Sequence, residues 1–232
     1  MALKIVKLLM SDITHANRDK REISVLKKLG CEVVAVFPSD EESFILADEG
    51  YNISQVLRPI LSYDQPKIVR ILRILELWIR LIRKIRQLEP DIISCHDLTA
   101  LAIGWLSVVM SMGNNSPKLI YDSHEFEIGR NLDKKRNRLS SWIIKVLEGL
   151  LMRKTAFSIM VSDSIADEVQ KIHHLQTRPI VVRNMHNHWE INQENCMNKR
   201  IEICDLLRVP VSTFLVMYHG AIMRNRGLKI LY

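Results

Sequence analysis

The 232-residue sequence contains no GxGxxG motif, no CxxC pair and no apolar run long enough to cross a membrane. The missing glycine motif argues against a dinucleotide-binding fingerprint. The missing cysteine pairs argue against a disulfide framework or a zinc site, so we interpret the four cysteines as reduced thiols of a cytoplasmic protein. The longest strongly apolar stretch, ALAIGWLSVVMSM, has 13 residues. That is too few for a bilayer core of about 30 Å, and a buried helix is expected there.

The sequence also lacks internal repeats, low-complexity segments and a recognisable signal peptide. The apolar run in MALKIVKLLMSD ends at Asp12, and no small-residue cleavage site follows it. Hydrophobic residues make up 47% of the chain and charged residues 25%. This composition is typical of a soluble globular protein that folds around its own core.

Positive charge is concentrated in one segment, residues 67–88. It holds seven basic residues and one acidic residue, which accounts for +6 of the net charge of +7. At helical spacing one half of this segment is apolar and the other half is basic. A solvated basic face and a face that contacts an anionic membrane are both consistent with this pattern, and we expect the apolar half to face inward. The segment lacks the aromatic platforms of a nucleic-acid site, so no nucleic-acid partner is predicted.

Short, nearly continuous apolar runs alternate with helical patterns along most of the chain. Strands buried on both faces indicate a parallel sheet, so the predicted fold class is α/β with a doubly wound, Rossmann-like sheet. We expect this domain over residues 1–185, a linker with a short helix over 186–210, and the start of a second such domain over 211–232. Strands are expected at 4–10, 31–38, near 56–57, and at 91–97, 118–124, 157–163, 179–184 and 213–220; helices are expected at 18–30, 67–88, 98–113, 138–154 and 164–174.

Ligands of doubly wound sheets bind beyond the carboxyl ends of the strands, so the polar residues there are candidate site residues. They include His96-Asp97, Asp122 to Glu125, and Asn184. Three of them have a structural alternative. His124 and Glu125 could form a polar strand end, and Asp97 could cap the next helix. The remaining candidates for metal binding are His173, His174, His186 and His188, which lack partners at metal spacing and are predicted to be surface histidines.

Five stretches, in order, resemble the retaining nucleotide-sugar glycosyltransferases of family 4, which have the two-domain GT-B fold. They are RDKRE with GCEVVAVFP (18–38), PDIISCHDLTAL (90–101), KLIYDSHEFE (118–127), VSDSIADEV with VVRN (161–184), and YHGAIMRNRGLKIL (218–231). The resemblance implies an amino-terminal acceptor domain, a carboxyl-terminal nucleotide-sugar domain and no metal or other cofactor.

The resemblance also implies roles for individual residues. His124 would face the transferred sugar as a catalytic residue, with a nearby carboxylate, Glu125 or Asp122, orienting its ring. Arg18, His96, Asp97, Asp122 and Asn184 would bind substrate, although a solvated helix start is the favoured interpretation of Arg18, Arg21 and Glu22. The phosphates of the donor would meet Gly220, Arg224 and Arg226.

The implied partners are a nucleotide sugar, a sugar or lipid-linked acceptor, and an anionic membrane reached through residues 67–88 on its cytoplasmic side. The donor motif of the family is not found before Tyr232, so we expect this chain alone to have little or no transferase activity. Three alternatives stay open. They are a non-catalytic or split-subunit module that pairs with a donor-domain chain, a sugar-nucleotide epimerase of the same architecture, and a nucleic-acid binder.

Overall fold

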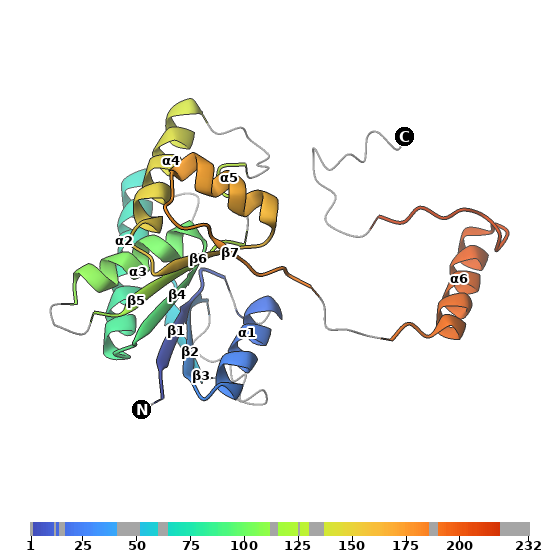
Figure 1. Cartoon of the computed structure of the whole chain (residues 1–232), viewed down its shortest axis with the longest axis horizontal. Coiled ribbons are helices and arrows are strands. Elements are labelled where there is room, and N and C mark those ends of the chain that lie inside the picture. The colour runs from blue at the N-terminus through green and yellow to red at the C-terminus, as the bar shows by residue number, and fades with distance from the viewer. Residues whose placement is uncertain are drawn as a thin grey trace. The chain divides into compact units, whose positions relative to one another are not determined.

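The computed structural model describes residues 2–11, 13, 17–40, 52–59, 65–111, 116–124, 126–129, 137–185 and 190–218. Strands and helices alternate along the first 181 residues, except that β3 follows β2 directly in the order of described elements (Figure 1). In chain order the elements are β1 (Lys4–Leu8), α1 (Asn17–Lys28), β2 (Glu32–Ser39), β3 (Asn52–Leu57), α2 (Lys67–Gln87), β4 (Ile92–His96), α3 (Asp97–Val109), β5 (Lys118–Asp122), α4 (Arg138–Met152), β6 (Phe157–Met160), α5 (Asp163–His173), β7 (Ile180–Val181) and α6 (Gln193–Leu207).

The strands form one sheet of seven in the order β3-β2-β1-β4-β5-β6-β7, and every neighbouring pair is parallel. The chain builds outward from β1 to β3, then returns to add β4 on the other side of β1. This reversal creates a switch point between β1 and β4, where the carboxyl ends of the two strands lie side by side. The predicted doubly wound α/β class is confirmed.

Helices cover both faces of the sheet. The larger core packs β-strand side chains such as Val6 and Val36 against α2, α3, α4 and α5. The smaller core packs Ile5, Val33 and Phe37 against Ile23 of α1 on the other face. Strand β2 is buried over seven of its eight residues, as expected of a strand covered on both sides.

Helix α3 approaches the sheet closely at Gly104. A Cβ atom on this residue would lie 2.4 Å from the Cys95 Sγ atom of β4, so only glycine fits without a shift. This contact holds α3, and the residues at its start, directly against the carboxyl end of β4.

All four cysteines are free thiols, and burial raises the pKa of the Cys95 thiol far above its usual range.

Helix α2 is amphipathic, but only its second half is packed on the sheet. Leu77, Leu81 and Ile85 are buried, whereas Ile71 and Leu75 are 56% and 48% exposed. The expectation that the whole apolar half faces inward is therefore wrong for the first turns. Periodicity identifies the apolar face of a helix, but it does not show how far the sheet extends beneath it. Within the residues that the structure describes, no helix is long and apolar enough to span a membrane.

The chain divides into two compact units, and the described residues 190–218 belong to the second. Its described part contains α6, whose Arg200 donates hydrogen bonds to the carbonyl oxygens of Val211 and Thr213. The predicted buried strand at 213–220 is wrong over its described residues, 213–218, which form no strand and expose Phe214 and Met217. A strand needs a paired neighbour, and the described part of this unit offers none. The second domain predicted for 211–232 stays a prediction.

Candidate functional site

Two histidines meet at the switch point of the sheet. His96 ends β4, and His124 lies two residues after the end of β5. The His96 Nδ1 and His124 Nε2 atoms are 2.9 Å apart, and the rings meet edge to face with centroids separated by 4.9 Å. The His96 side chain is buried, whereas the His124 side chain is 29% exposed. The site therefore presents one imidazole to solvent and supports it with a second.

A buried network of charged side chains lies beneath the two rings. Arg18, at the start of α1, donates hydrogen bonds to Asp122 Oδ1 at 2.7 Å and to Glu22 Oε1 at 3.0 Å. Lys7, inside β1, donates to Glu22 and lies 3.5 Å from Asp19 Oδ1. Lys7, Arg18, Asp19 and Asp122 are all buried, so each charge depends on the others for stabilisation.

The carboxylates of this network interact with both histidines. Asp19 Oδ1 lies 2.9 Å from His96 Nδ1, and Asp122 Oδ2 lies 3.7 Å from His124 Nε2. Burial by itself would raise the pKa of the Asp19 carboxyl, but its 2.9 Å contact with His96 and the positive charge of Lys7 lower that pKa to about 2. The pKa of Asp122 is also lowered, because His124, His96 and Arg18 outweigh the effect of burial.

The pKa of His124 is raised. Burial would lower it, but the Asp122 carboxylate and the charge of Asp19 have the larger combined effect. A raised pKa makes the His124 ring easier to protonate than a free imidazole. His124 is therefore suited to donating a hydrogen bond to an oxygen that carries negative charge.

The same region has an unusual backbone conformation and buried polar atoms without hydrogen-bond partners in the described part of the chain. Asp97 has a left-handed backbone with φ of 69° although it is not glycine. The buried Arg18 Nη1 and His96 Nε2 atoms have no hydrogen-bond partner within the described residues. Such strain and unsatisfied polar atoms cost stability, and they concentrate at functional sites. The helix-cap interpretation of Asp97 is wrong, because His96 occupies the N-cap position of α3 and makes no side-chain cap bond.

The other predicted site residues fall in three groups. Arg18 and Asp122 belong to the network, so the solvated helix start is wrong for Arg18, which is 6% exposed. Asn184 is exposed, and its Oδ1 atom accepts a hydrogen bond of 2.7 Å from Arg21. Four predicted residues lie outside the described part of the chain: Glu125, Gly220, Arg224 and Arg226.

Lys7 and Asp19 are members of the network that sequence reasoning missed. Lys7 interrupts the apolar run KIVKLLM, and a lysine inside a buried strand is itself a signal of an ion pair. Asp19 lies in the highly charged segment RDKRE, where one carboxylate cannot be told from another by pattern alone. Its partner His96 is distant in the sequence.

Among the residues that the structure describes, two sets of side chains bring metal-ligand atoms together: Asp19 with His96 and His124, and Glu22 with His96 and Asp122. Lys7 and Arg18 already pair with the carboxylates of both sets. A divalent cation there would face two buried positive charges, which disfavours its binding. The absence of a metal stays a prediction.

His173 is not the surface histidine that the sequence predicted. It is 3% exposed, and its Nε2 atom lies 3.1 Å from Glu148 Oε2, while Tyr121 donates a hydrogen bond of 2.9 Å to Glu148 Oε1. Gly149 makes room for the ring, since a Cβ atom there would lie 2.7 Å from His173 Nδ1. This buried triad joins α4, α5 and β5 and serves packing. His174 is exposed, whereas His186 and His188 lie outside the described residues.

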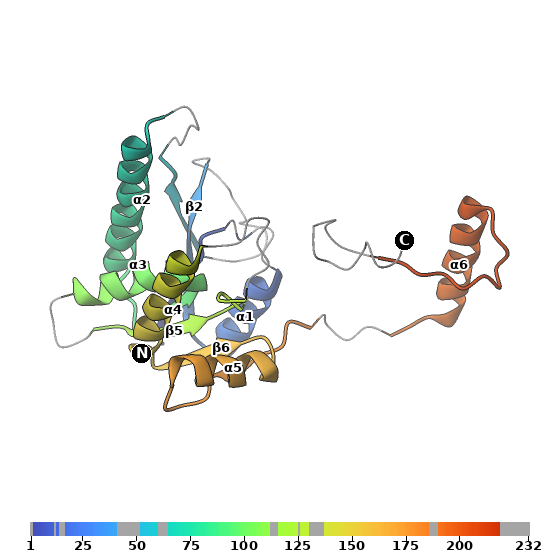
Figure 2. The same cartoon turned by 90° about the horizontal axis from the view of Figure 1, so that it is seen from above.

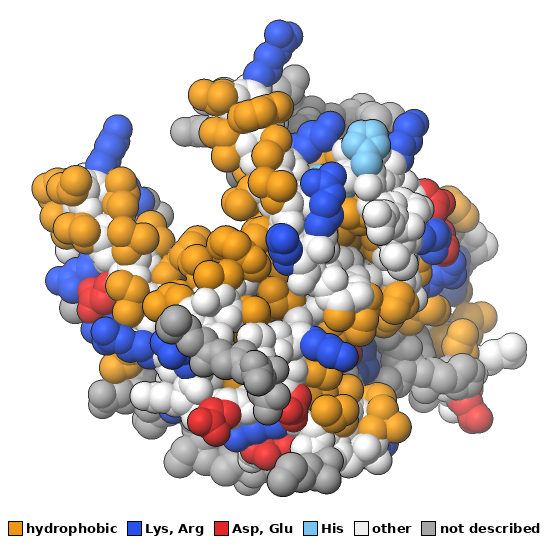
Figure 3. Space-filling view, turned by 60° about the vertical axis from the view of Figure 1, so that its left-hand side comes forward, with side chains coloured by type: hydrophobic (Ala, Val, Ile, Leu, Met, Phe, Trp, Pro, Cys, Tyr) orange, Lys and Arg blue, Asp and Glu red, His pale blue; other side chains and the backbone are white. Residues whose placement is uncertain are grey.

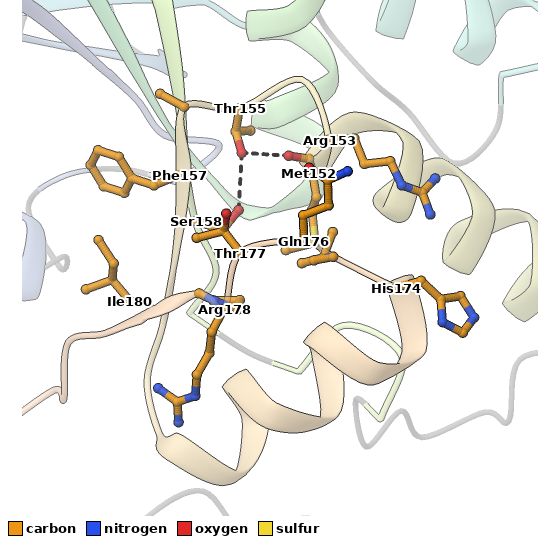
Figure 4. A pocket seen from close by; sticks show the side chains of 13 residues that line it. Met152, Arg153, Thr155, Phe157, Ser158, His174, Gln176, Thr177, Arg178 and Ile180 are labelled. Atoms are coloured by element: carbon orange, nitrogen blue, oxygen red, sulfur yellow. Dashed lines mark hydrogen bonds between the residues drawn. The ribbon is translucent and has the colours of Figure 1, made fainter.

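A cavity of about 490 Å³ lies next to Thr155, Ser158 and Arg178 (Figure 4). Thr155 Oγ1 donates a hydrogen bond to the Met152 carbonyl oxygen at 2.7 Å and lies 3.3 Å from Ser158 Oγ. The cavity is lined by Phe157 and Ile180, the first residues of β6 and β7. It therefore opens at the amino ends of the strands, opposite the edge that carries His124, and we do not assign it to the candidate site.

The ion pairs of Asp19 predict a loss of stability at acid pH. A lowered pKa in the folded state adds stability above the ordinary pKa of 3.8, and this contribution is lost as the pH falls toward about 2. It amounts to about 2 kcal/mol. We expect chemical denaturation at several pH values to show a steeper acid loss for the wild type than for Asp19→Asn. Equal slopes for the two proteins would contradict the lowered pKa.

The chain resembles solved structures of nucleotide-sugar enzymes over nearly its whole length. Sucrose-phosphate synthase from Thermosynechococcus elongatus matches 99% of the chain with 10% identity and a TM-score of 0.64, over 58% of its own length. Anabaena HepE, solved with UDP and glucose, matches 87% with 12% identity and a TM-score of 0.59, over 50% of its length. A UDP-N-acetylglucosamine 2-epimerase matches 89% with 11% identity and a TM-score of 0.54, over 61% of its length.

At these low identities the likeness establishes the fold alone, and the chain spans between half and two thirds of the length of these three structures. No curated protein matches the sequence. The family model described as Glycosyltransferase Family 4 matches residues 22–187, a region that includes β2 to β7 and both histidines of the site. This match covers more than half of the sequence, and the chain therefore belongs to Glycosyltransferase Family 4.

Proposed function

We propose that the chain provides the acceptor-binding domain of a glycosyltransferase that moves a sugar from a nucleotide-sugar donor to an acceptor with retention of configuration. The observation that carries the proposal is the position of His124. It lies beyond the carboxyl end of β5, partly exposed, above ion pairs that hold its ring in place. The carboxyl edge of the sheet and the buried ion pairs beneath it together define the site.

His124 would contact the transferred sugar through its outward ring nitrogen. Its Nε2 atom faces His96 and Asp122, so we expect Nδ1 to meet the substrate. The raised pKa of His124 supports a role as a protonated, positively charged hydrogen-bond donor. A neutral imidazole would be enough to bind a sugar hydroxyl. The charged donor strengthens its bond as negative charge develops on the substrate.

The donor phosphates would be bound outside this domain. By family resemblance, Gly220 allows close approach of the backbone, and Arg224 and Arg226 neutralise the diphosphate. The departing diphosphate would help to deprotonate the acceptor on the same face of the sugar. Lys7 and Arg18 already neutralise the carboxylates of Asp19 and Asp122. We therefore propose a mechanism without a metal or other cofactor.

The acceptor is proposed to be a sugar or a lipid-linked sugar at the cytoplasmic face of a membrane. Residues 67–88 carry a net charge of +6, which supports contact with an anionic bilayer. A separate chain that carries the donor domain is a further proposed partner.

Transfer assays can separate this function from its alternatives. The chain would be incubated, alone and with a donor domain in the same or a second polypeptide, with a panel of UDP-, ADP- and GDP-sugars and a membrane extract as acceptor. We expect transfer of labelled sugar to the extract only when a donor domain is present. Conversion of the free sugar nucleotide to an epimer without any acceptor would instead identify an epimerase. The absence of transfer and of epimerisation would favour the non-catalytic module.

A further inference from the structure

Helices α2 and α4 expose apolar side chains that no described part of the protein covers. Each helix has six large hydrophobic residues that are exposed, including Ile71, Leu72 and Leu75 on α2 and Trp142, Ile143 and Leu150 on α4. Both helices pack against α3, which lies between them (Figure 2). Figure 3 shows the result as two hydrophobic ridges with Lys or Arg at their tips and a hollow between them whose floor is also hydrophobic. A soluble domain rarely exposes so large an apolar surface unless it binds something.

The hollow contains a groove of about 450 Å³. Six apolar side chains line it, among them Trp78 of α2, Ala102 of α3 and Leu147 of α4. This volume lies within the range of ligand pockets, and the lining suits a hydrocarbon chain. We refer to it as the α2–α4 groove.

The α2–α4 groove adjoins the candidate site. Asp97, Thr99 and Glu127 also line it. Asp97 directly follows His96, and Glu127 is three residues after His124. A molecule with its chain in the groove would therefore place a polar head near the two histidines.

The charges on the ridges select the kind of lipid. Lys67 and Arg70 are exposed at the start of α2, and Arg138 and Lys145 are exposed on α4. The acidic residue of α2, Glu76, is already paired with Arg73 and Arg80. Glu148, the acidic residue of α4, is buried. Cations beside an exposed apolar surface complement an anionic bilayer, which attracts the charges while the apolar side chains enter the headgroup boundary.

We propose that the α2–α4 groove binds the hydrocarbon chain of an anionic lipid acceptor, which the domain takes directly from a bilayer seated on the two ridges. The inference rests on the proposed transferase function and names its class of acceptor. It also changes the expected membrane contact. The apolar first turns of α2, together with α4, enter the lipid, rather than the basic face of α2 alone.

Vesicle sedimentation tests the ridges without any sugar transfer. Phosphatidylcholine vesicles would be compared with vesicles that also contain about one third phosphatidylglycerol. We expect the full chain to sediment with the anionic vesicles only. The variant Ile71→Ser with Leu75→Ser should bind about tenfold more weakly. Val25→Ser with Leu29→Ser is the matched control, because Val25 on α1 and Leu29 just after its end are exposed at the same spacing and should not affect binding.

Fluorescence quenching tests the groove itself. In a chain with Trp105, Trp142 and Trp189 replaced by Phe, lipids brominated on their acyl chains should quench Trp78. Filling the groove with Thr99→Leu and Ala102→Leu should reduce this quenching at least twofold while sedimentation is retained.

Four results would overturn the inference. The first is equal binding to neutral and anionic vesicles, or binding to neither. The second is sedimentation without quenching of Trp78, which would mean that the bilayer docks but no chain enters the groove. The third is a dimer in solution that Ile71→Ser with Leu75→Ser disrupts, which would assign the ridges to a second copy of the chain. Transfer to a soluble sugar that is indifferent to lipid would contradict this inference while leaving the proposed function intact.

Discussion

Replacing His124 by alanine is expected to lower the rate of sugar transfer by roughly 100- to 1,000-fold while the domain stays folded. The side chain is partly exposed, so its removal leaves no large cavity. What is lost is a hydrogen-bond donor that the Asp122 carboxylate and His96 hold in position. The measurement is kcat with saturating nucleotide sugar, in a form of the protein that includes a donor domain.

His174→Asn provides the matched control for this prediction. His174 is an exposed histidine that ends α5 with a left-handed backbone, and asparagine tolerates that backbone. This variant should transfer sugar at the wild-type rate. The melting temperature of His124→Ala should also remain within a few degrees of the wild type. If His124→Ala retained full activity, His124 would not face the transferred sugar, and the proposed site would be wrong.

The sheet could be predicted from the sequence because its signals are local. Runs such as VVAVF in CEVVAVFP are apolar over four or more residues, and turns or helical patterns separate the runs from one another. Each strand and helix of the first unit was placed to within a few residues by this alternation. The parallel arrangement follows in turn, because a helix that connects two buried strands of one sheet usually makes a crossover between parallel strands.

The ion pairs of the site could not be predicted, because their partners are far apart in the sequence. Arg18 and Asp122 are separated by 104 residues, and Lys7 pairs with Asp19 and Glu22 on another element. A charged segment such as RDKRE is typical of a solvated helix start. Only the fold reveals that Arg18 pairs with Asp122 at the end of β5. The same reason explains His173, whose partner Glu148 lies on a different helix.

The exposed ridges illustrate a second limit of sequence reasoning. The periodicity of residues 67–88 correctly identified an apolar face, but the same pattern describes a helix face covered by a sheet and one that faces a membrane. The sheet covers the second half of α2 and leaves the first half exposed. Which apolar residues are core and which are surface depends on the positions of other elements.

Replacing Arg18 by alanine is expected to destabilise the protein by about 3–5 kcal/mol, because it leaves the buried Asp122 carboxylate without its cation. Asp122 is fully buried and cannot regain the interaction from solvent. For a domain of this size, that loss lowers the melting temperature by roughly 10 °C. Thermal unfolding followed by circular dichroism measures the effect.

Arg21→Ala is the matched control for Arg18→Ala, since both arginines lie in the first turns of α1. Arg21 pairs with the exposed Asn184, so its loss should cost no more than about 1 kcal/mol. Adding Asp122→Asn to Arg18→Ala should recover part of the lost stability, because it removes the unpaired charge. Equal destabilisation by the two arginine variants would mean that the Arg18–Asp122 pair does not support the site. In that case the position of His124 would depend on its contacts with His96 and Asp122 without support from Arg18.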